Sequence, residues 1–162
     1  DIGNADPRAL QLTLNAWDVQ RRLGPPEGEL ALAQAVVYLA VAAKSNAVYA
    51  AWHAARALVA AGGSEAVPMH LRNAATSLMK SMGYGESYRY AHDFDEGFVP
   101  GERYFPETVG EQVFYEPTER GLEGKIREKL VYLRKLSADS DFQRYENDAE
   151  PGDPGGDNPK AP

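Results

Sequence analysis

The sequence predicts a mainly α fold: a helical bundle with an irregular insertion that has room for one small β-hairpin, followed by a flexible acidic tail. Apolar residues recur at helical spacing in segments that Gly and Pro separate. Residues 84–117 show little periodicity, and the chain from Ser137 is rich in acids, Pro and Gly. With 162 residues, 43% of them hydrophobic, we expect one helical domain over residues 1–136 and a tail over 137–162.

Asp6 and Pro7 predict the start of the first helix. Aspartate can accept hydrogen bonds from the first backbone N–H groups, and proline at the first helical position has no N–H to leave unpaired. Apolar residues recur from Leu10 to Leu23, and Gly24-Pro25-Pro26 then ends the helix.

The second and third helices are predicted from about Glu27 to Ala43 and from about Asn46 to Ala61, with Ser45 as candidate N-cap of the third. Both are alanine-rich and apolar nearly all the way round, a pattern typical of helices that are buried on more than one side. Either they form a central hairpin that the other helices cover, or a second copy of the chain covers one side. The candidate oligomer interface is Val37, Val41, Val48, Tyr49 and Trp52.

Two further helices are expected, one on each side of the irregular segment. Leu71 to Met82 has helical spacing and is followed by Gly83, which suits a left-handed cap. In the segment after it, Ser87–Tyr90 and Gln112–Tyr115 are candidate short strands. The last helix is predicted to start with Thr118 as N-cap. Its apolar stripe is Leu122, Ile126, Leu130, Leu133 and Leu136, and Glu123 and Arg127 are spaced for an i,i+4 ion pair.

Charge and composition exclude several classes of protein. The net charge is −7, but residues 137–162 hold seven acids and two bases, so the remainder is close to neutral and lacks the basic surplus of a stand-alone nucleic-acid binder. The chain has no cysteine, which rules out disulfides and thiolate chemistry and suits a reducing cytoplasm. DIGNADPRAL is not a signal peptide, and the apolar run from Leu30 to Ala43 is too short to span a membrane.

No catalytic, cofactor-binding or metal-binding residue is assigned. The sequence contains neither a P-loop nor a G-x-S-x-G elbow. A metal-dependent hydrolase would have to use His92 and Asp93 with neighbouring acids or with His53 and His70, and ordinary surface or core histidines are the favoured interpretation. Candidate nucleic-acid contacts interleave aromatic and basic side chains, as stacking platforms do, although the tyrosines can equally pack the irregular segment onto the helices. These candidates are Arg72, Lys80, Tyr84, Tyr88 and Arg89.

The stretch VPMHLRNAATSLMKSMGYGESYRYAHDFDEGFVPGERYFPE, followed by FYEPTERGLEGKIREKL, resembles the C-terminal domain of the RarA/MgsA family of AAA+ ATPases. These are clamp-loader-like proteins, and the Werner-helicase-interacting protein is their eukaryotic relative. The motif HLRNA-x-T-x-LMK-x-x-GYG is specific, and the resemblance covers about residues 1–136. Ala43 is a departure, since the family usually has proline before Lys-Ser-Asn.

The resemblance implies that the chain is a fragment without chemistry of its own. The parent protein would be a DNA-dependent ATPase of replication, recombination and repair that binds ATP and Mg²⁺ through a module absent here. Its C-terminal domain would form the homotetramer. Single-stranded-DNA-binding protein and fork DNA are the expected partners through the parent, and the expected location is the bacterial cytoplasm at the nucleoid. The alternative function is a DNA- or protein-docking module that uses the aromatic-basic segment after Gly83.

Overall fold

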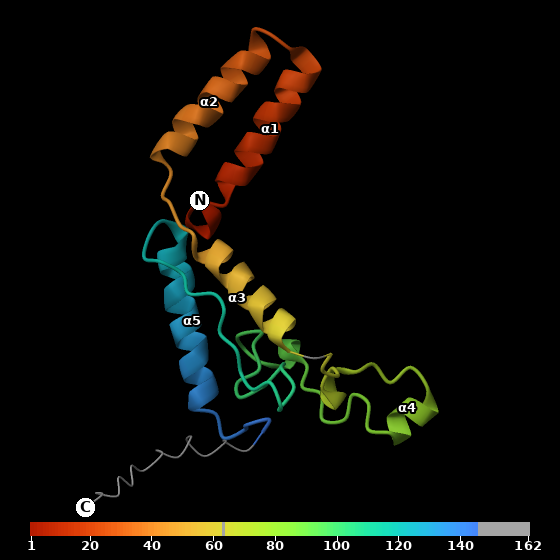
Figure 1. Cartoon of the computed structure of the whole chain (residues 1–162). Helices are drawn as coiled ribbons and strands as arrows, with labels where there is room; N and C mark the ends of the chain where they lie inside the picture. The colour runs from red at the N-terminus through yellow and green to blue at the C-terminus, as the bar shows by residue number, and fades with distance from the viewer. Residues whose placement is uncertain (63, 146–162) are drawn as a thin grey trace, which may run out of the picture.

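The computed structural model of this chain describes residues 1–62 and 64–145, and it confirms the mainly α fold (Figure 1). Its α-helices are α1 (Arg8–Leu23), α2 (Glu27–Val41), α3 (Ala47–Ala61), α4 (Ser77–Ser81) and α5 (Leu122–Ala138). Of three short 3₁₀ helices in the described residues, η1 (Gly3–Ala5) precedes α1, whereas η2 (Met69–Leu71) and η3 (Ala91–Asp93) lie on either side of α4. No helix in the described residues is both long enough and apolar enough to cross a membrane.

α1 and α2 form an antiparallel hairpin, and the sequence largely predicts where each helix begins and ends. α1 starts after Pro7 and ends at Gly24, as predicted, and α2 ends at Val41, slightly earlier than expected. The buried residues between the two helices are all small: Ala9, Ala16, Gly28 and Ala35. A Cβ at Gly28 would lie 2.6 Å from the Cα of Gln20, so the helices cross too closely for any side chain at that position.

The hairpin projects from the rest of the chain. α1 and α2 pack on each other and approach no other α-helix in the described residues (Figure 1). At the base of the hairpin, the carboxylate of Asp6 accepts hydrogen bonds from the guanidinium of Arg8, at 2.9 and 3.1 Å, and from the hydroxyl of Tyr38, at 2.5 Å. These bonds lower the pKa of Asp6 to about 2, so the carboxylate stays charged at neutral pH.

α3 confirms the predicted third helix, which ends at Ala61. Asn46 directly precedes α3, but the side chain that caps its first turn is that of Ser45, whose Oγ accepts a hydrogen bond from the backbone N–H of Ala47 at 3.1 Å. α5 begins at Leu122, later than the Thr118 cap predicted.

The apolar stripe of α5 is largely confirmed. Four of its five predicted members are partly buried, namely Ile126, Leu130, Leu133 and Leu136, whereas Leu122 is more exposed. The stripe contributes to the packing of α5 on the irregular segment, since Leu130 and Leu133 lie with Phe98 and Val113 around one cavity.

The helix predicted from Leu71 to Met82 is wrong over its first half. η2 comes first, and α4 begins only at Ser77. The reason is Thr76, which is extended and uses its Oγ1 to accept a hydrogen bond from a backbone N–H in the first turn of α4, at 3.2 Å. Gly83 follows α4 with a φ of +82°, as predicted for a left-handed cap. The apolar spacing therefore runs through an N-cap that periodicity alone does not reveal.

Residues 84–117 are irregular, as predicted. The described residues contain no strand, so Ser87–Tyr90 and Gln112–Tyr115 do not form the hairpin for which the sequence had room. Proline and left-handed glycine, such as Gly101 with a φ of +73°, interrupt the segment.

A buried carboxylate fixes the irregular segment. Arg144 donates from Nε and Nη2 to the two carboxylate oxygens of Glu102, each at 2.6 Å, and Nε2 of His70 lies 3.4 Å from the same group. Burial would raise the pKa of Glu102, but the hydrogen bonds from Arg144 and from the backbone N–H of Arg103 outweigh it and lower the pKa. The side chain of Arg144 thereby fastens the chain beyond α5 to the irregular segment. We call α5 and residues 64–117 together the body.

We call residues 1–6, 42–47 and 115–123 the elbow, because the hairpin, α3 and α5 meet there. Glu123 lies at its centre and is fully buried. Its carboxylate accepts hydrogen bonds from Ser45 Oγ at 2.7 Å, from Tyr115 OH at 2.9 Å, and from the backbone N–H and hydroxyl of Thr118 at 2.9 and 2.8 Å. Close packing adds to this: a Cβ at Gly121 would lie 2.1 Å from the carbonyl oxygen of Ala5.

The predicted i,i+4 ion pair between Glu123 and Arg127 is wrong. Arg127 instead pairs with Glu119, at 2.5 Å, on the surface. The spacing rule describes the exposed side of a helix, whereas Glu123 faces the buried elbow, where its four hydrogen-bond donors come from other segments.

We expect Glu123→Gln to lower the free energy of unfolding by about 2 kcal/mol at neutral pH, because an amide cannot replace a buried carboxylate that accepts four hydrogen bonds. Burial would raise the pKa of Glu123, but these bonds lower it. The stability that the carboxylate contributes is therefore fully present above the unfolded value of about 4.3 and is lost as the pH falls through the folded pKa. Urea unfolding of both proteins should show a difference that shrinks below about pH 4. An equal difference at pH 7 and pH 3 would contradict this account.

Candidate interaction surface

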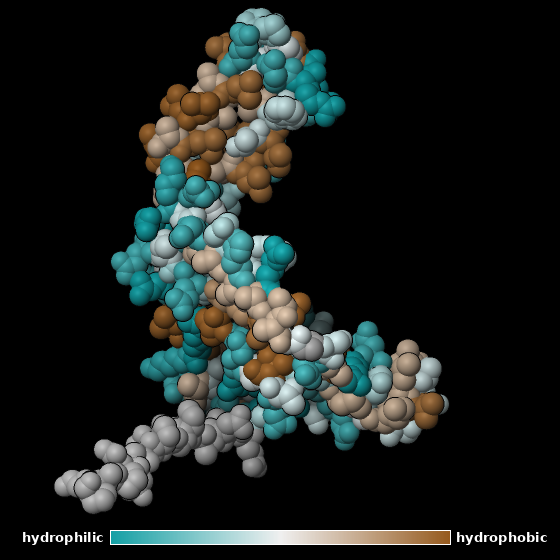
Figure 2. Space-filling view, viewed as in Figure 1, coloured by the Kyte–Doolittle hydropathy of each residue, from teal (hydrophilic) through white to brown (hydrophobic). Residues whose placement is uncertain are grey.

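The large apolar side chains of the first three helices lie on the outside of the chain. Among the described residues, the buried apolar side chains are five alanines and one valine: Ala5, Ala9, Ala16, Ala35, Ala47 and Val99. By contrast, Trp17 is 62% exposed and Trp52 is 61% exposed. Figure 2 shows the hairpin as the most hydrophobic part of the surface in this view. This is the reverse of the usual distribution, in which large apolar residues are the ones buried.

α1 has three distinct sides. One faces α2 through small residues, and a second is polar, with Gln11 bonded to Asn15 at 2.7 Å and Asp18 paired with Arg22 at 2.6 Å. The third side carries Leu10, Leu14 and Trp17, which are all exposed and are spaced i, i+4, i+7. This apolar side packs on nothing in the described chain that would account for its hydrophobicity.

α2 presents a matching stripe on the same face of the hairpin. At 100° per residue, Leu32 and Val36 lie about 40° and 80° round α2 from the buried residue Gly28. In α1, Trp17, Leu10 and Leu14 lie about 80°, 100° and 140° round the helix from Ala9, so Leu14 is at the outer edge of the stripe. These angles are counted in the direction of the sequence from a residue at the seam. Because the two helices run antiparallel, similar angles of this kind place both stripes on the same face of the hairpin. We call this surface the hairpin face, which consists of Leu10, Leu14, Trp17, Leu32 and Val36.

The back of α2, opposite α1, is apolar as well. Leu30, Val37 and Val41 are spaced i, i+7, i+11 there, and Val41 is 81% exposed. On α3, Val48, Trp52 and Val59 form another exposed stripe. Tyr49 lies beside it, with its ring centre 4.2 Å from that of His53 and the two rings tilted by 49°.

The five residues predicted as an oligomer interface are therefore all exposed in the single chain. Val37 and Val41 lie on the back of α2, and Val48, Tyr49 and Trp52 lie on α3. The hairpin face was not among the predicted residues. The i, i+4, i+7 spacing of Leu10, Leu14 and Trp17 was a usable signal, but only the position of α2 shows that this stripe faces away from the seam.

The candidate nucleic-acid contacts differ in their exposure and in their contacts with the rest of the described chain. Arg89 is partly buried, with its guanidinium 4.0 Å from the ring centre of Phe142 and 4.7 Å from that of Phe94. Arg72 donates to the carbonyl of Val67 at 2.6 Å and lies over the ring of Tyr84. The remaining two candidates, Lys80 and Tyr88, are exposed.

The histidines proposed as metal ligands have ordinary structural surroundings. His70 is buried and bonded to the carbonyl of Arg103 at 3.0 Å, while His92 and Asp93 lie exposed in η3. The described residues contain no group of three side chains placed to hold a metal ion.

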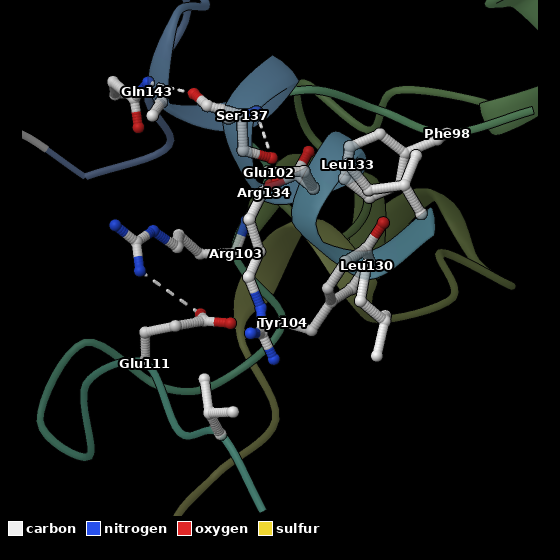
Figure 3. A pocket seen from close by; sticks show the side chains of 13 residues that line it. Phe98, Glu102, Arg103, Tyr104, Glu111, Leu130, Leu133, Arg134, Ser137 and Gln143 are labelled. Atoms are coloured by element: carbon white, nitrogen blue, oxygen red, sulfur yellow. Dashed lines mark hydrogen bonds and ion pairs between the residues drawn. The ribbon is translucent and has the colours of Figure 1, made fainter. Parts of the chain in front are cut away.

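A cavity of about 520 Å³ lies between α5 and residues 98–113. Figure 3 shows Phe98, Leu130 and Leu133 on one side and the ion pair of Arg103 with Glu111, at 3.4 Å, on the other. Ser137 also bonds to the backbone N–H of Gly101 across it, at 3.3 Å. These contacts join α5 to the irregular segment, so the cavity belongs to the packing of the body.

Comparisons with known proteins agree on one family. A family model described as the MgsA AAA+ ATPase C terminal matches residues 1–134. The chain is 62% identical over 137 residues to the replication-associated recombination protein A of Coxiella burnetii, covering 85% of this chain and 31% of that protein. The protein of the same name from Escherichia coli (strain K12) is 55% identical over 145 residues, which are 90% of this chain and 32% of that protein. ATPase WRNIP1 of Dictyostelium discoideum is 40% identical over 116 residues, 72% of this chain and 13% of that protein. The chain thus spans about a third of the bacterial relatives.

We expect Arg89→Ala to lower the free energy of unfolding by about 1–2 kcal/mol, because it removes two cation–π contacts and the packing of the arginine stem. Lys80→Ala, at an exposed position on α4, is the matched control and should change it by less than about 0.5 kcal/mol. Urea unfolding measures both. If the two substitutions proved equally mild, the structural role assigned to Arg89 would be wrong.

Proposed function

Because this chain belongs to the family of MgsA AAA+ ATPase C-terminal domains, we propose that it is the module through which copies of a replication-associated recombination ATPase assemble, as a tetramer. The observation that carries this is the exposure of large apolar side chains on three sides: the hairpin face, the back of α2, and α3. In this role the chain carries no chemistry of its own.

The hydrophobic effect makes such exposure unfavourable for a monomer. Burying one Leu, Val or Phe-sized side chain contributes about 1.5–3 kcal/mol, and monomers rarely expose apolar patches larger than a few hundred Å². At least nine large apolar residues of α1–α3 are more than half exposed in the single chain: Leu10, Leu14, Trp17, Leu30, Val36, Val37, Val41, Tyr49 and Trp52. Contact with other copies would remove most of this surface from water.

The arrangement favours an assembly larger than a dimer. A two-fold contact covers one patch on each subunit, and closed tetramers commonly use two different two-fold contacts. α2 carries apolar residues both on the hairpin face, at Val36, and on its back, at Val37, and these two positions point in directions about 100° apart. A partner that covers one side therefore leaves the other available.

Assembly would serve the parent protein by concentrating its ATPase modules. Linking modules raises their effective concentration for one another without any new contact between them. We extend the proposal to the whole protein: ATP and Mg²⁺ would bind to its other module, and fork DNA and single-stranded-DNA-binding protein would be engaged in the bacterial cytoplasm, at the nucleoid.

Light scattering on the purified 162-residue chain tests the proposal. We expect a tetramer, or a dimer–tetramer mixture, at micromolar concentration. Val37→Glu and Trp52→Glu each place a charge in an apolar surface and should lower the average mass, whereas Gln11→Glu, on the polar side of α1, should leave it unchanged. A wild-type chain that is monomeric at every concentration would overturn the proposed function.

A further inference from the structure

We infer that the hairpin face of one chain packs against the hairpin face of a second copy, so that two α1–α2 hairpins complete an intermolecular four-helix bundle. This assigns a partner to one particular surface, which consists of Leu10, Leu14, Trp17, Leu32 and Val36. It rests on the proposed function, since it requires self-association, but self-association through other surfaces would not require it.

The seam of the hairpin is a weak core by itself. It is lined by Ala9, Ala16, Gly28 and Ala35, which bring the helices close together but bury little apolar area. The large side chains of both helices lie beside the seam on one face. Two helices with a small-residue seam and a large-residue face have the pattern of half a four-helix bundle, in which the missing half supplies the core.

The polar side of α1 restricts where the partner can lie. Gln11, Asn15, Asp18 and Arg22 bond to one another in pairs along that side, which suits contact with water. A partner packed there would bury two pairs of polar groups for no apolar gain. The hairpin face is the remaining side on which both helices expose large apolar residues together.

Three properties favour a second copy as the occupant. The remaining α-helices in the described residues do not approach α1 or α2, and the bonds of Asp6 with Arg8 and Tyr38 hold the base of the hairpin. Toward the turn of the hairpin, the stripe of α1 continues from Trp17 to Arg21, and the stripe of α2 begins with Glu29 before Leu32. The face therefore has charges of both signs and can pack against its own copy without net repulsion.

The area is also sufficient. Helices of 16 and 15 residues are about 23 Å long, and two side by side are about 20 Å wide. A face of roughly 450 Å² on each copy would bury on the order of 1,000 Å² in total, which is near the lower limit for a specific interface. Further contacts at the back of α2 and on α3 would add to it in a tetramer.

The first experiment compares Leu14→Glu with Asn15→Glu, two neighbours on α1 of which only the first lies on the hairpin face. We expect Leu14→Glu to weaken self-association at least tenfold, measured by sedimentation equilibrium on the full 162-residue chain. Asn15→Glu should leave it within twofold of wild type. Circular dichroism establishes that each variant keeps its helix content.

The second experiment does not depend on the charged variant folding. The chain has no cysteine, so a single introduced cysteine reports proximity without background. Leu14→Cys and Val36→Cys, alone and mixed, should give covalent dimers with a short bifunctional thiol reagent. Asn15→Cys, on the polar side, should give none under the same conditions.

The outcomes separate this inference from the proposed function. A monomeric wild-type chain would overturn both. An oligomeric wild type whose mass Leu14→Glu does not change, or whose Leu14 and Val36 cysteines do not cross-link, would overturn the hairpin pairing alone and leave α3 and the back of α2 as the contacts. Loss of association by Leu14→Glu together with the predicted cross-links would establish the pairing.

Discussion

The buried carboxylate of Glu123 is the interaction on which the arrangement of this chain depends. It accepts hydrogen bonds from residues before α3 and before α5, and Tyr115, one of its donors, is itself bonded to Asn4 at 3.1 Å. A charge with no exposure to water must be satisfied from every side, which fixes the positions of its donors. Together with the close packing of Gly121 on Ala5, this group holds the elbow from which α3, α5 and the hairpin leave.

That arrangement has a cost for the hairpin. Since the elbow directs α1 and α2 away from α3 and α5, their large side chains find no partner in the described part of the chain. The body, by contrast, is fastened by polar contacts such as those of Glu102 with Arg144 and His70. A chain divided in this way is specified locally by buried hydrogen bonds, and the apolar surface that remains is suited to association between copies.

Much of the fold could be predicted because its signals are local. Asp6-Pro7, Gly24-Pro25-Pro26 and the apolar repeats mark the hairpin and α3. The errors arose where a side chain bonds to residues outside its own helix, or where a capping residue lies within an apolar repeat. Thr76 interrupts an apolar repeat by capping α4. Glu123 does not pair with its i,i+4 neighbour Arg127 but bonds to Ser45, which is remote in sequence, and to Tyr115 and Thr118, which precede α5. The predicted interface residues of α2 and α3 are exposed, but the hairpin face needed the position of both helices.

The sequence by itself determined α1, α2, α3, the apolar stripe of α5 and the family, because periodicity, proline and glycine act over a few residues. Only the tertiary structure decided which side of each helix is left uncovered. Alanine is as compatible with an interior as leucine, so composition could not show that Ala9 and Ala16 face the seam while Leu10 and Leu14 face outward. Exposure is a property of the arrangement of helices, and that arrangement is set by the elbow, whose contacts join residues far apart in the chain.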